Sequence, residues 1–176
     1  MTIAIVPAGA VESGVLTVLK QGIRDVFGKE TVVLDPVEGP AYAFDKDRSQ
    51  YLAAAIIKRL SEEKAYSGHE LVLGVVDADL YATNAGFVFG EAAGKTAVVS
   101  ITRLRESFYG LEEDRELFLK RALTEAVHEL GHCSGLGHCY TAPCAMFFSN
   151  SIVDTDRKGP TFCRMCAKRI AGLQAP

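Results

Sequence analysis

The first 34 residues contain two short apolar runs, and between them apolar residues recur at the spacing of a helix. Residues 2–6 (TIAIV) and 31–34 (TVVL) are β-branched runs, and a proline closely follows each of them. Between these runs, apolar residues recur every three or four positions: Val15, Leu19, Ile23 and Val26. The runs are typical of strands, and the spacing between them is typical of an amphipathic helix. The pattern therefore predicts a β-α-β unit at the start of the chain.

A second helix and three more strands follow. From about Asp47 to Leu60, leucine and isoleucine recur at intervals of four with alanines between them, and Asp47 is available as an N-terminal cap. Strand-like apolar runs cover residues 71–76, 86–89 and 97–101, and residues 91–95 have the length and the glycine of a hairpin loop. Together with the two opening strands, these runs predict a mixed sheet of five strands.

The most regular helical pattern extends from about Asp114 to Ser134. Its apolar residues fall on one face: Leu119, Leu123, Ala126, Val127 and Leu130. Asp114 and the neighbouring glutamates suit the N-terminus of such a helix. Beyond Gly135 the pattern stops, and apolar residues become too rare to hold the chain together by packing alone. We therefore expect a single α/β (α+β) domain over residues 1–176, in which residues 1–135 form the sheet and the long helix. Residues 136–176 then form a C-terminal part that needs another kind of support.

Length and charge limit what this chain can do. It has 176 residues, of which 48% are hydrophobic, so it can form one domain with its own core. Its 19 Lys and Arg residues against 22 Asp and Glu residues give no reason to expect a nucleic-acid or anionic-membrane partner. The apolar runs are far shorter than the roughly 20 residues that cross a bilayer. No basic segment precedes the first apolar run, so we expect a cytoplasmic protein, with a monomer as the default.

An H-E-x-x-H motif, formed by His128, Glu129 and His132, has the spacing of a zinc site. Positions four apart share one face of a helix, so both imidazoles can bind one metal ion. Glu129 is turned about 100° from His128, and it can reach a water at the metal as a general base without being a ligand. Gly135 can end the helix in a left-handed conformation, which lets His138 return as a third ligand.

Four of the five cysteines form a C-x4-C pair and a C-x2-C pair: Cys139, Cys144, Cys163 and Cys166. Four thiolates close a tetrahedral zinc site and leave no position for water, which is typical of a structural site. The alternative is free cysteines or two disulfides, but local pairs in a chain without a secretory signal favour metal. We therefore expect two zinc ions per chain, a catalytic one at the histidines and a structural one at the cysteines.

The motifs together are similar to a known protein family. The order H-E-x-x-H-x-x-G-x-x-H followed by Met146 resembles the metzincin zinc peptidases, in which a methionine-containing turn lies beneath the histidines. The cysteine spacing narrows the resemblance to the archaemetzincin family, over about residues 71–166. The resemblance implies a metzincin-like fold and a zinc metallopeptidase, which hydrolyses peptide or protein substrates through a zinc-bound water activated by Glu129. Residues 86–91 resemble the strand along which metzincins bind an extended substrate, and a buried hairpin strand is the alternative.

Two other functions fit parts of the pattern. One is a non-catalytic peptide-binding or scaffold protein that keeps both zinc sites. The other is a zinc-dependent ribonuclease, because one such family has an H-x-x-x-H-x-x-G-x-x-H array, although a glycine stands there in the place of Glu129. Outside the motifs, we interpret His69 as a surface or core residue and Cys133 as a small buried hydrophobe. We interpret Tyr140 as a packing residue and not as an oxyanion donor.

Overall fold

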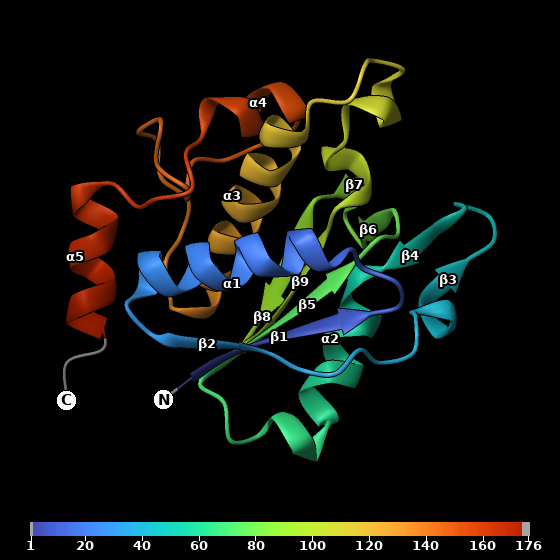
Figure 1. The fold of residues 1–176 in the computed structure, drawn as a ribbon, viewed down its shortest axis with the longest axis horizontal. Coiled ribbons are helices and arrows are strands. Elements are labelled where there is room, and N and C mark those ends of the chain that lie inside the picture. Colours follow the sequence, from blue (N-terminus) through green and yellow to red (C-terminus); the bar gives the residue numbers. More distant parts are fainter. Residues whose placement is uncertain (1, 174–176) are drawn as a thin grey trace.

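A five-stranded sheet forms the centre of the structure, a computed structural model that describes residues 2–173 (Figure 1). Its strands, in their order across the sheet, are β2 (Glu30–Val33), β1 (Thr2–Ala8), β5 (Leu71–Val76), β9 (Thr96–Ser100) and β8 (Gly90–Ala93). The first four are parallel, and β8 is antiparallel to β9. Every residue of β5 and β9 is buried, as expected for inner strands of a sheet that is covered on both faces. The predicted mixed sheet and the α/β class are confirmed.

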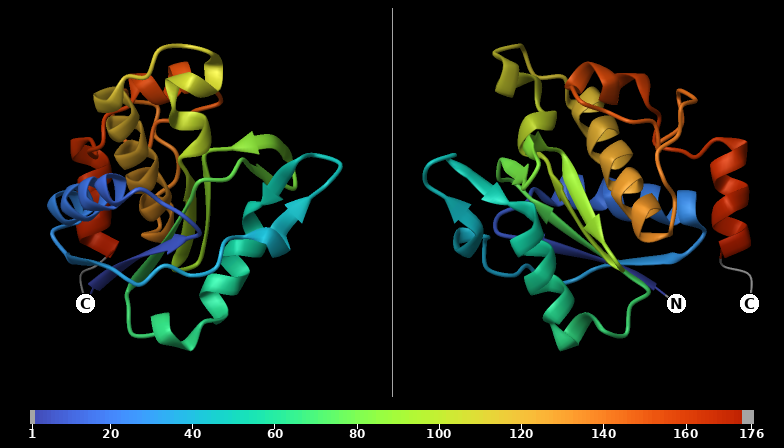
Figure 2. Two further views of the ribbon diagram at one scale, coloured as in Figure 1. Left: turned by 45° about the vertical axis from the view of Figure 1, so that its right-hand side comes forward. Right: turned by 180° about the vertical axis from the view of Figure 1, so that it is seen from behind.

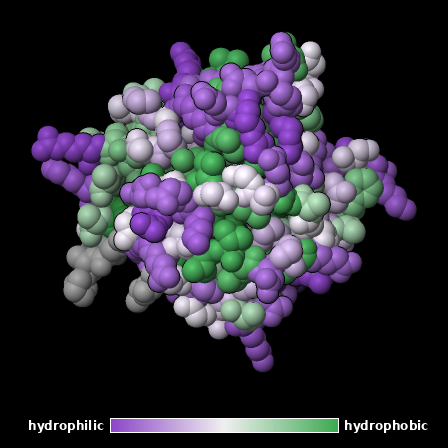
Figure 3. All heavy atoms as spheres, viewed as in Figure 1, coloured by the Kyte–Doolittle hydropathy of each residue, from purple (hydrophilic) through white to green (hydrophobic). Residues whose placement is uncertain are grey.

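Helices cover both faces of this sheet (Figure 2). Helices α1 (Ser13–Phe27) and α3 (Arg115–Cys133) pack on one face, and α2 (Ala53–Glu62) packs on the other. Alternation along β1 explains this, because Ile3 and Ile5 enter the core with α1 and α3, whereas Val6 enters the core with α2. Four short 3₁₀ helices complete the connections: η1 (Ala41–Ala43), η2 (Lys64–Tyr66), η3 (Thr102–Leu104) and η4 (Glu106–Tyr109). On the face seen in Figure 3, hydrophilic residues lie around smaller hydrophobic areas.

A second, four-stranded sheet differs from the prediction. Its strands are β3 (Phe44–Asp45), β4 (Gln50–Leu52), β6 (Leu80–Ala82) and β7 (Ala85–Val88). The helix predicted from Asp47 begins only at Ala53, because the residues before it form the β3–β4 hairpin and β4 pairs with β6. Asp47 therefore caps no helix, and its backbone N–H instead donates to Oδ1 of Asp45 (3.0 Å) in the hairpin turn. Strands of two to four residues are too short to show a recognisable alternation of apolar and polar residues in the sequence.

The predicted hairpin also lies at different residues. β9 pairs with β8 through a two-residue turn that begins at Gly94, whose φ is 58°. The apolar run 86–89 belongs mostly to β7, which pairs with β6 in the small sheet. β8 consists of small residues and one glutamate because it lies close against α3. A Cβ at Gly90 would lie only 2.6 Å from Cγ of Glu129.

Two helices occur in the C-terminal part, where no element was predicted: α4 (Ile152–Arg157) and α5 (Arg164–Leu173). The hydroxyl of Ser151 caps α4 by accepting a hydrogen bond from the backbone N–H of Asp154 (3.3 Å). α5 stands at the edge of the molecule (Figure 1) and packs through Cys166 and Ile170 into a small cluster that contains Met146. Among the helices that the structure describes, none is long and apolar enough to cross a membrane.

Candidate active site

Three histidines gather at the C-terminal end of α3. The Nε2 atoms of His128 and His132 are 3.1 Å apart, and His138 returns to them from the loop beyond the helix. One ring nitrogen from each of the three lies within 4.8 Å of the others. Gly135 makes this turn with a φ of 87°, and its backbone N–H donates to the carbonyl oxygen of His132 (2.9 Å). The structure thus brings together the three ligands that the motif predicts.

Backbone carbonyls orient two of these rings. Nδ1 of His128 donates to the carbonyl oxygen of Ala145 (2.8 Å), and Nδ1 of His132 donates to that of Leu136 (2.8 Å). A proton on Nδ1 leaves the lone pair on Nε2, which faces the other rings. Burial lowers the pKa of His128 well below its ordinary value, and burial also lowers the pKa of His138. Neutral imidazoles with converging nitrogens are the form that binds zinc, so these residues fit a zinc ion.

A cleft of about 200 Å³ opens beside Glu129, which directly follows His128 on α3. Residues of β7 and β8 line one side, residues 148–150 line the other, and α3 contributes Glu125 and Glu129. Phe148 connects this cleft to the histidines, because its ring centroid lies 4.7 Å from that of His138. A molecule in the cleft therefore contacts Glu129 and is separated from His138 by the ring of Phe148.

Close packing holds Glu129 at this place. Its side chain is almost completely buried, and it lies so near β8 that only a residue without a side chain fits at Gly90. Burial raises the pKa of Glu129 well above its ordinary value, and the carboxylates of Glu125 and Glu91 act in the same direction. The positive charge of Lys158 opposes them. Glu129 is thus a carboxyl group with an increased proton affinity, which suits a general base.

Met146 is fully buried beneath α3. Its sulfur occupies the space that a side chain at Gly131 would fill. The backbone N–H of Cys139 donates to the carbonyl oxygen of Met146 (2.8 Å), and the preceding Ala145 supplies the carbonyl that orients His128. The turn that contains Met146 therefore supports the histidines from below, in the position that the resemblance to metzincins implies.

The four cysteines of the two predicted pairs converge at one point, with their sulfur atoms within 4.8 Å of one another. Cys139 and Cys144 lie on the loop around Met146, and Cys163 and Cys166 lie at the start of α5. The backbone N–H of Cys163 donates to Sγ of Cys144 (3.3 Å). The pKa of Cys163 is lowered to about 7, chiefly by a hydrogen bond from the backbone of Cys166. Four converging sulfur atoms, of which those of Cys139, Cys144 and Cys163 accept backbone N–H groups, fit a closed tetrahedral zinc site.

Comparison with known proteins identifies the family. Residues 14–172 match Peptidase family M54. The chain belongs to this family. An archaemetzincin of Methanocaldococcus jannaschii is 42% identical over 172 residues, which cover 97% of this chain and 93% of that protein. An archaemetzincin of Pyrococcus furiosus is 39% identical over 175 residues, which cover 96% of this chain and 91% of that protein.

Solved structures of archaemetzincins share the fold. The one from Methanopyrus kandleri has a TM-score of 0.86 and 36% sequence identity, and the match covers 98% of this chain and 94% of that one. The one from Archaeoglobus fulgidus, complexed with malonate, has a TM-score of 0.83 and 38% identity over 96% of this chain and 99% of that one. The predicted archaemetzincin family and zinc metallopeptidase class are confirmed, and no finding favours the non-catalytic alternative.

The interpretations of three residues outside the motifs of this archaemetzincin have different outcomes. The interpretation of Tyr140 as a packing residue is wrong, because its side chain is 94% exposed on the loop between two cysteines. His69 lies outside the site and shares a hydrogen bond with the hydroxyl of Thr2 (2.7 Å), which is the structural role expected. Cys133 is only partly buried and packs against the main core. Burial raises its pKa to about 12, so it behaves as the small hydrophobe expected.

Sequence reasoning missed several residues of the cleft. Glu125 was detectable, because it lies one helical turn before Glu129 and interrupts the apolar pattern of α3. Gly90 stands in a run of small residues that gave no strand signal. Lys158 and Phe148 belong to no motif, and only the tertiary structure brings them to the active-site helix and to His138.

Proposed function

We propose that this archaemetzincin cleaves peptide bonds at a catalytic zinc site formed by His128, His132 and His138, with Glu129 as the general base. The position of Glu129 carries the proposal. It is a buried carboxyl group in the wall of the cleft, on the same turn of α3 as two of the three histidines. Such a group can reach a water molecule beside the metal without taking a ligand position.

The zinc site and Glu129 have different roles in the proposed reaction. Zinc at a three-histidine site polarises a peptide carbonyl and lowers the pKa of water. Glu129 takes one proton from the water whose oxygen forms a bond with the carbonyl carbon. Glu129 then gives this proton to the amide nitrogen as the C–N bond breaks. Its raised pKa supports the first transfer, because a carboxylate with a higher pKa is a stronger base.

We propose that the substrate binds as an extended segment beside residues 86–91. β7 is an edge strand of the four-stranded sheet, and β8 is an edge strand of the five-stranded sheet. Both strands line the cleft that contains Glu129. An edge strand has unpaired backbone groups with which an added peptide strand can form hydrogen bonds. This edge position favours substrate binding over the alternative of a buried hairpin strand.

We also propose a second, structural zinc site, which gives two zinc ions per chain. Its ligands are Cys139, Cys144, Cys163 and Cys166. The convergence of their sulfur atoms supports it, and so does the small apolar contact area of α5, which needs another support. A single domain over residues 1–176, a cytoplasmic location and a monomer stay predictions.

Replacing Glu129 with glutamine tests the proposed base. The substitution keeps the size of the side chain and removes its ability to take a proton. We expect peptide cleavage, measured by mass spectrometry on a peptide library, to fall by about 10² to 10⁴-fold. Zinc content, measured by elemental analysis, stays at the parent level. His132→Ala is the contrasting control, because it removes a proposed ligand. We expect this variant to lose one zinc ion per chain and to lose peptide cleavage.

Two results contradict the proposal. One is a zinc-loaded Glu129→Gln variant that keeps at least a tenth of the parent turnover. The other is a parent protein with two zinc ions per chain that cleaves none of the peptides in the library.

A further inference from the structure

A buried ion pair lies at the cleft, one helical turn from the proposed base. The side chain of Lys158, which directly follows α4, is fully buried. Its Nζ lies 2.9 Å from Oε1 and 3.1 Å from Oε2 of Glu125. The hydroxyl of Thr155 donates a further hydrogen bond to Oε1 (2.8 Å). Both oxygens of the Glu125 carboxylate are therefore occupied by partners from the C-terminal part.

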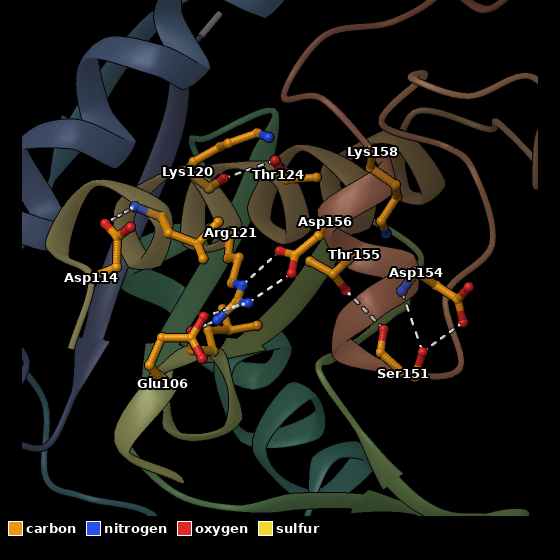
Figure 4. A network of polar contacts seen from close by, with 12 residues as sticks. Glu106, Asp114, Lys120, Arg121, Thr124, Ser151, Asp154, Thr155, Asp156 and Lys158 are labelled. Atoms are coloured by element: carbon orange, nitrogen blue, oxygen red, sulfur yellow. Dashed lines mark hydrogen bonds and ion pairs between the residues drawn. The ribbon is translucent and has the colours of Figure 1, made fainter. Parts of the chain in front are cut away.

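Stability alone does not explain this pair. Burying two charges costs about as much as their attraction returns, so a buried pair is weak evidence for a stabilising role. Helix α4 is also fastened to α3 by a second pair, in which Arg121 binds both carboxylate oxygens of Asp156 at 2.7 Å (Figure 4). That second pair does not line the cleft, whereas Glu125 does.

The remaining lining explains what the pair does for the cleft. Most of the other side chains that line it are apolar: Ala85, Phe87, Val88, Phe89 and Phe148. Glu125 and Glu129 are the charged residues among the described lining residues. An unpaired Glu125 would make this wall strongly negative and would bind the ammonium or guanidinium group of a substrate. With Lys158 in place, that carboxylate already has its cation.

We propose that Lys158 is a specificity-determining residue, which neutralises Glu125 and makes the cleft select an uncharged apolar side chain of the substrate. The chain thus supplies from within the positive charge that a lysine or arginine side chain of the substrate would otherwise bring. This inference rests on the proposed function, because it requires that a peptide binds in the cleft beside Glu129.

Two single substitutions and their combination test the inference, because the single variants are expected to favour substrate side chains of opposite charge. The substrates are matched peptides that carry leucine, lysine or glutamate at one position, scanned along both sides of the cleaved bond. Lys158→Met leaves Glu125 unpaired, and we expect kcat/KM for the best lysine peptide, relative to its leucine counterpart, to rise about 10- to 100-fold. Glu125→Gln leaves Lys158 unpaired, and we expect kcat/KM for the best glutamate peptide, relative to its leucine counterpart, to rise. The double variant removes both charges and returns both ratios toward those of the parent.

A matched control separates specificity from stability. Asp156→Asn weakens the same contact between α3 and α4 but removes no residue that lines the cleft. We expect it to lower the melting temperature and to leave the peptide ratios unchanged. If Lys158→Met does not fold, Glu125→Gln carries the test through the glutamate peptides.

Peptide binding gives a readout that does not depend on turnover. Dissociation constants of the same peptides are measured for Lys158→Met and Glu125→Gln in a Glu129→Gln background. If the parent cleaves no peptide but these constants shift as expected, the inference holds and the proposed function fails. If the parent cleaves peptides and the ratios of both folded variants stay within threefold of the parent, the inference is overturned and the proposed function stands.

Discussion

Replacing Gly90 with alanine tests whether the exact packing of β8 against Glu129 matters for catalysis. The new Cβ would lie 2.6 Å from Cγ and 2.9 Å from Cδ of Glu129, and 2.7 Å from the carbonyl oxygen of Val98. Val98 is fully buried in β9, so the contact with its carbonyl oxygen is relieved only by a shift of β8 at residue 90. The side chain of Glu129 is the more flexible neighbour, and we expect it to be displaced as well.

The size of the effect follows from these distances. An ordinary carbon–carbon contact is about 3.5 to 4.0 Å, so relief of the clash requires a displacement of about 1 Å. A misplacement of about 1 Å in a catalytic group lowers turnover by about 10²-fold. Overpacking of this kind also destabilises a fold by about 1 to 3 kcal/mol, so the protein remains folded if its stability is ordinary.

The assay compares kcat, zinc content and melting temperature in Gly90→Ala and in a matched control. Gly68→Ala is the control, because Gly68 lies in the turn between η2 and β5, outside the proposed substrate strand, and nothing lies within 4 Å of an added Cβ there. We expect Gly90→Ala to keep its zinc and to lose about 10²-fold in kcat, while Gly68→Ala stays close to the parent. The reasoning is refuted if folded, zinc-loaded Gly90→Ala has a kcat within twofold of the control.

Three further predictions concern the cysteines and the metal ions. Mild chelation removes one zinc ion per chain and leaves the other, because four thiolates in a closed shell hold zinc more tightly than three imidazoles and an exchangeable water. Elemental analysis that finds both ions lost with the fold intact contradicts the structural site. Cys166→Ser lowers the melting temperature by about 5 °C or more in calorimetry, and an unchanged value shows that Cys166 binds no metal. Partial burial raises the pKa of Cys133 to about 12, so we expect it to react with iodoacetamide at pH 8 far more slowly than the exposed thiol of a model peptide, and equal rates contradict this shift.

The sequence predicts best what is local. The long helix was placed almost to the residue, because its apolar positions and the Asp114 cap lie within one continuous segment. The H-E-x-x-H motif lies inside this helix, so the helical period alone brings its two imidazoles to one face. His138 returns to the other two imidazoles, as the sequence predicts, because a glycine with positive φ follows the helix at the predicted point.

The sequence predicts poorly what depends on contacts between distant segments. β8 has few β-branched residues, because the close approach of α3 requires small ones, and its hairpin was therefore assigned to the wrong residues. Lys158 is charged and lies between two short helices that the sequence does not predict, so nothing marks it as buried. Tyr140 shows the opposite error. As a large aromatic residue it is expected to be packed, but it is exposed on the loop between Cys139 and Cys144.

The active-site helix and the C-terminal part depend on each other for a physical reason. α3 buries several polar or charged side chains: Arg121, Thr124, Glu125, His128 and Glu129. Such groups destabilise a fold unless partners satisfy them, and the partners of Arg121, Glu125 and His128 come largely from residues 145–158. The same C-terminal part has little apolar area of its own. The polar groups that disturb the amphipathic pattern of α3 therefore help to order residues 145–158, and this segment in turn supplies Phe148 and the neighbouring residues that line the cleft. We accordingly expect the cleft and residues 145–158 of this archaemetzincin to form together.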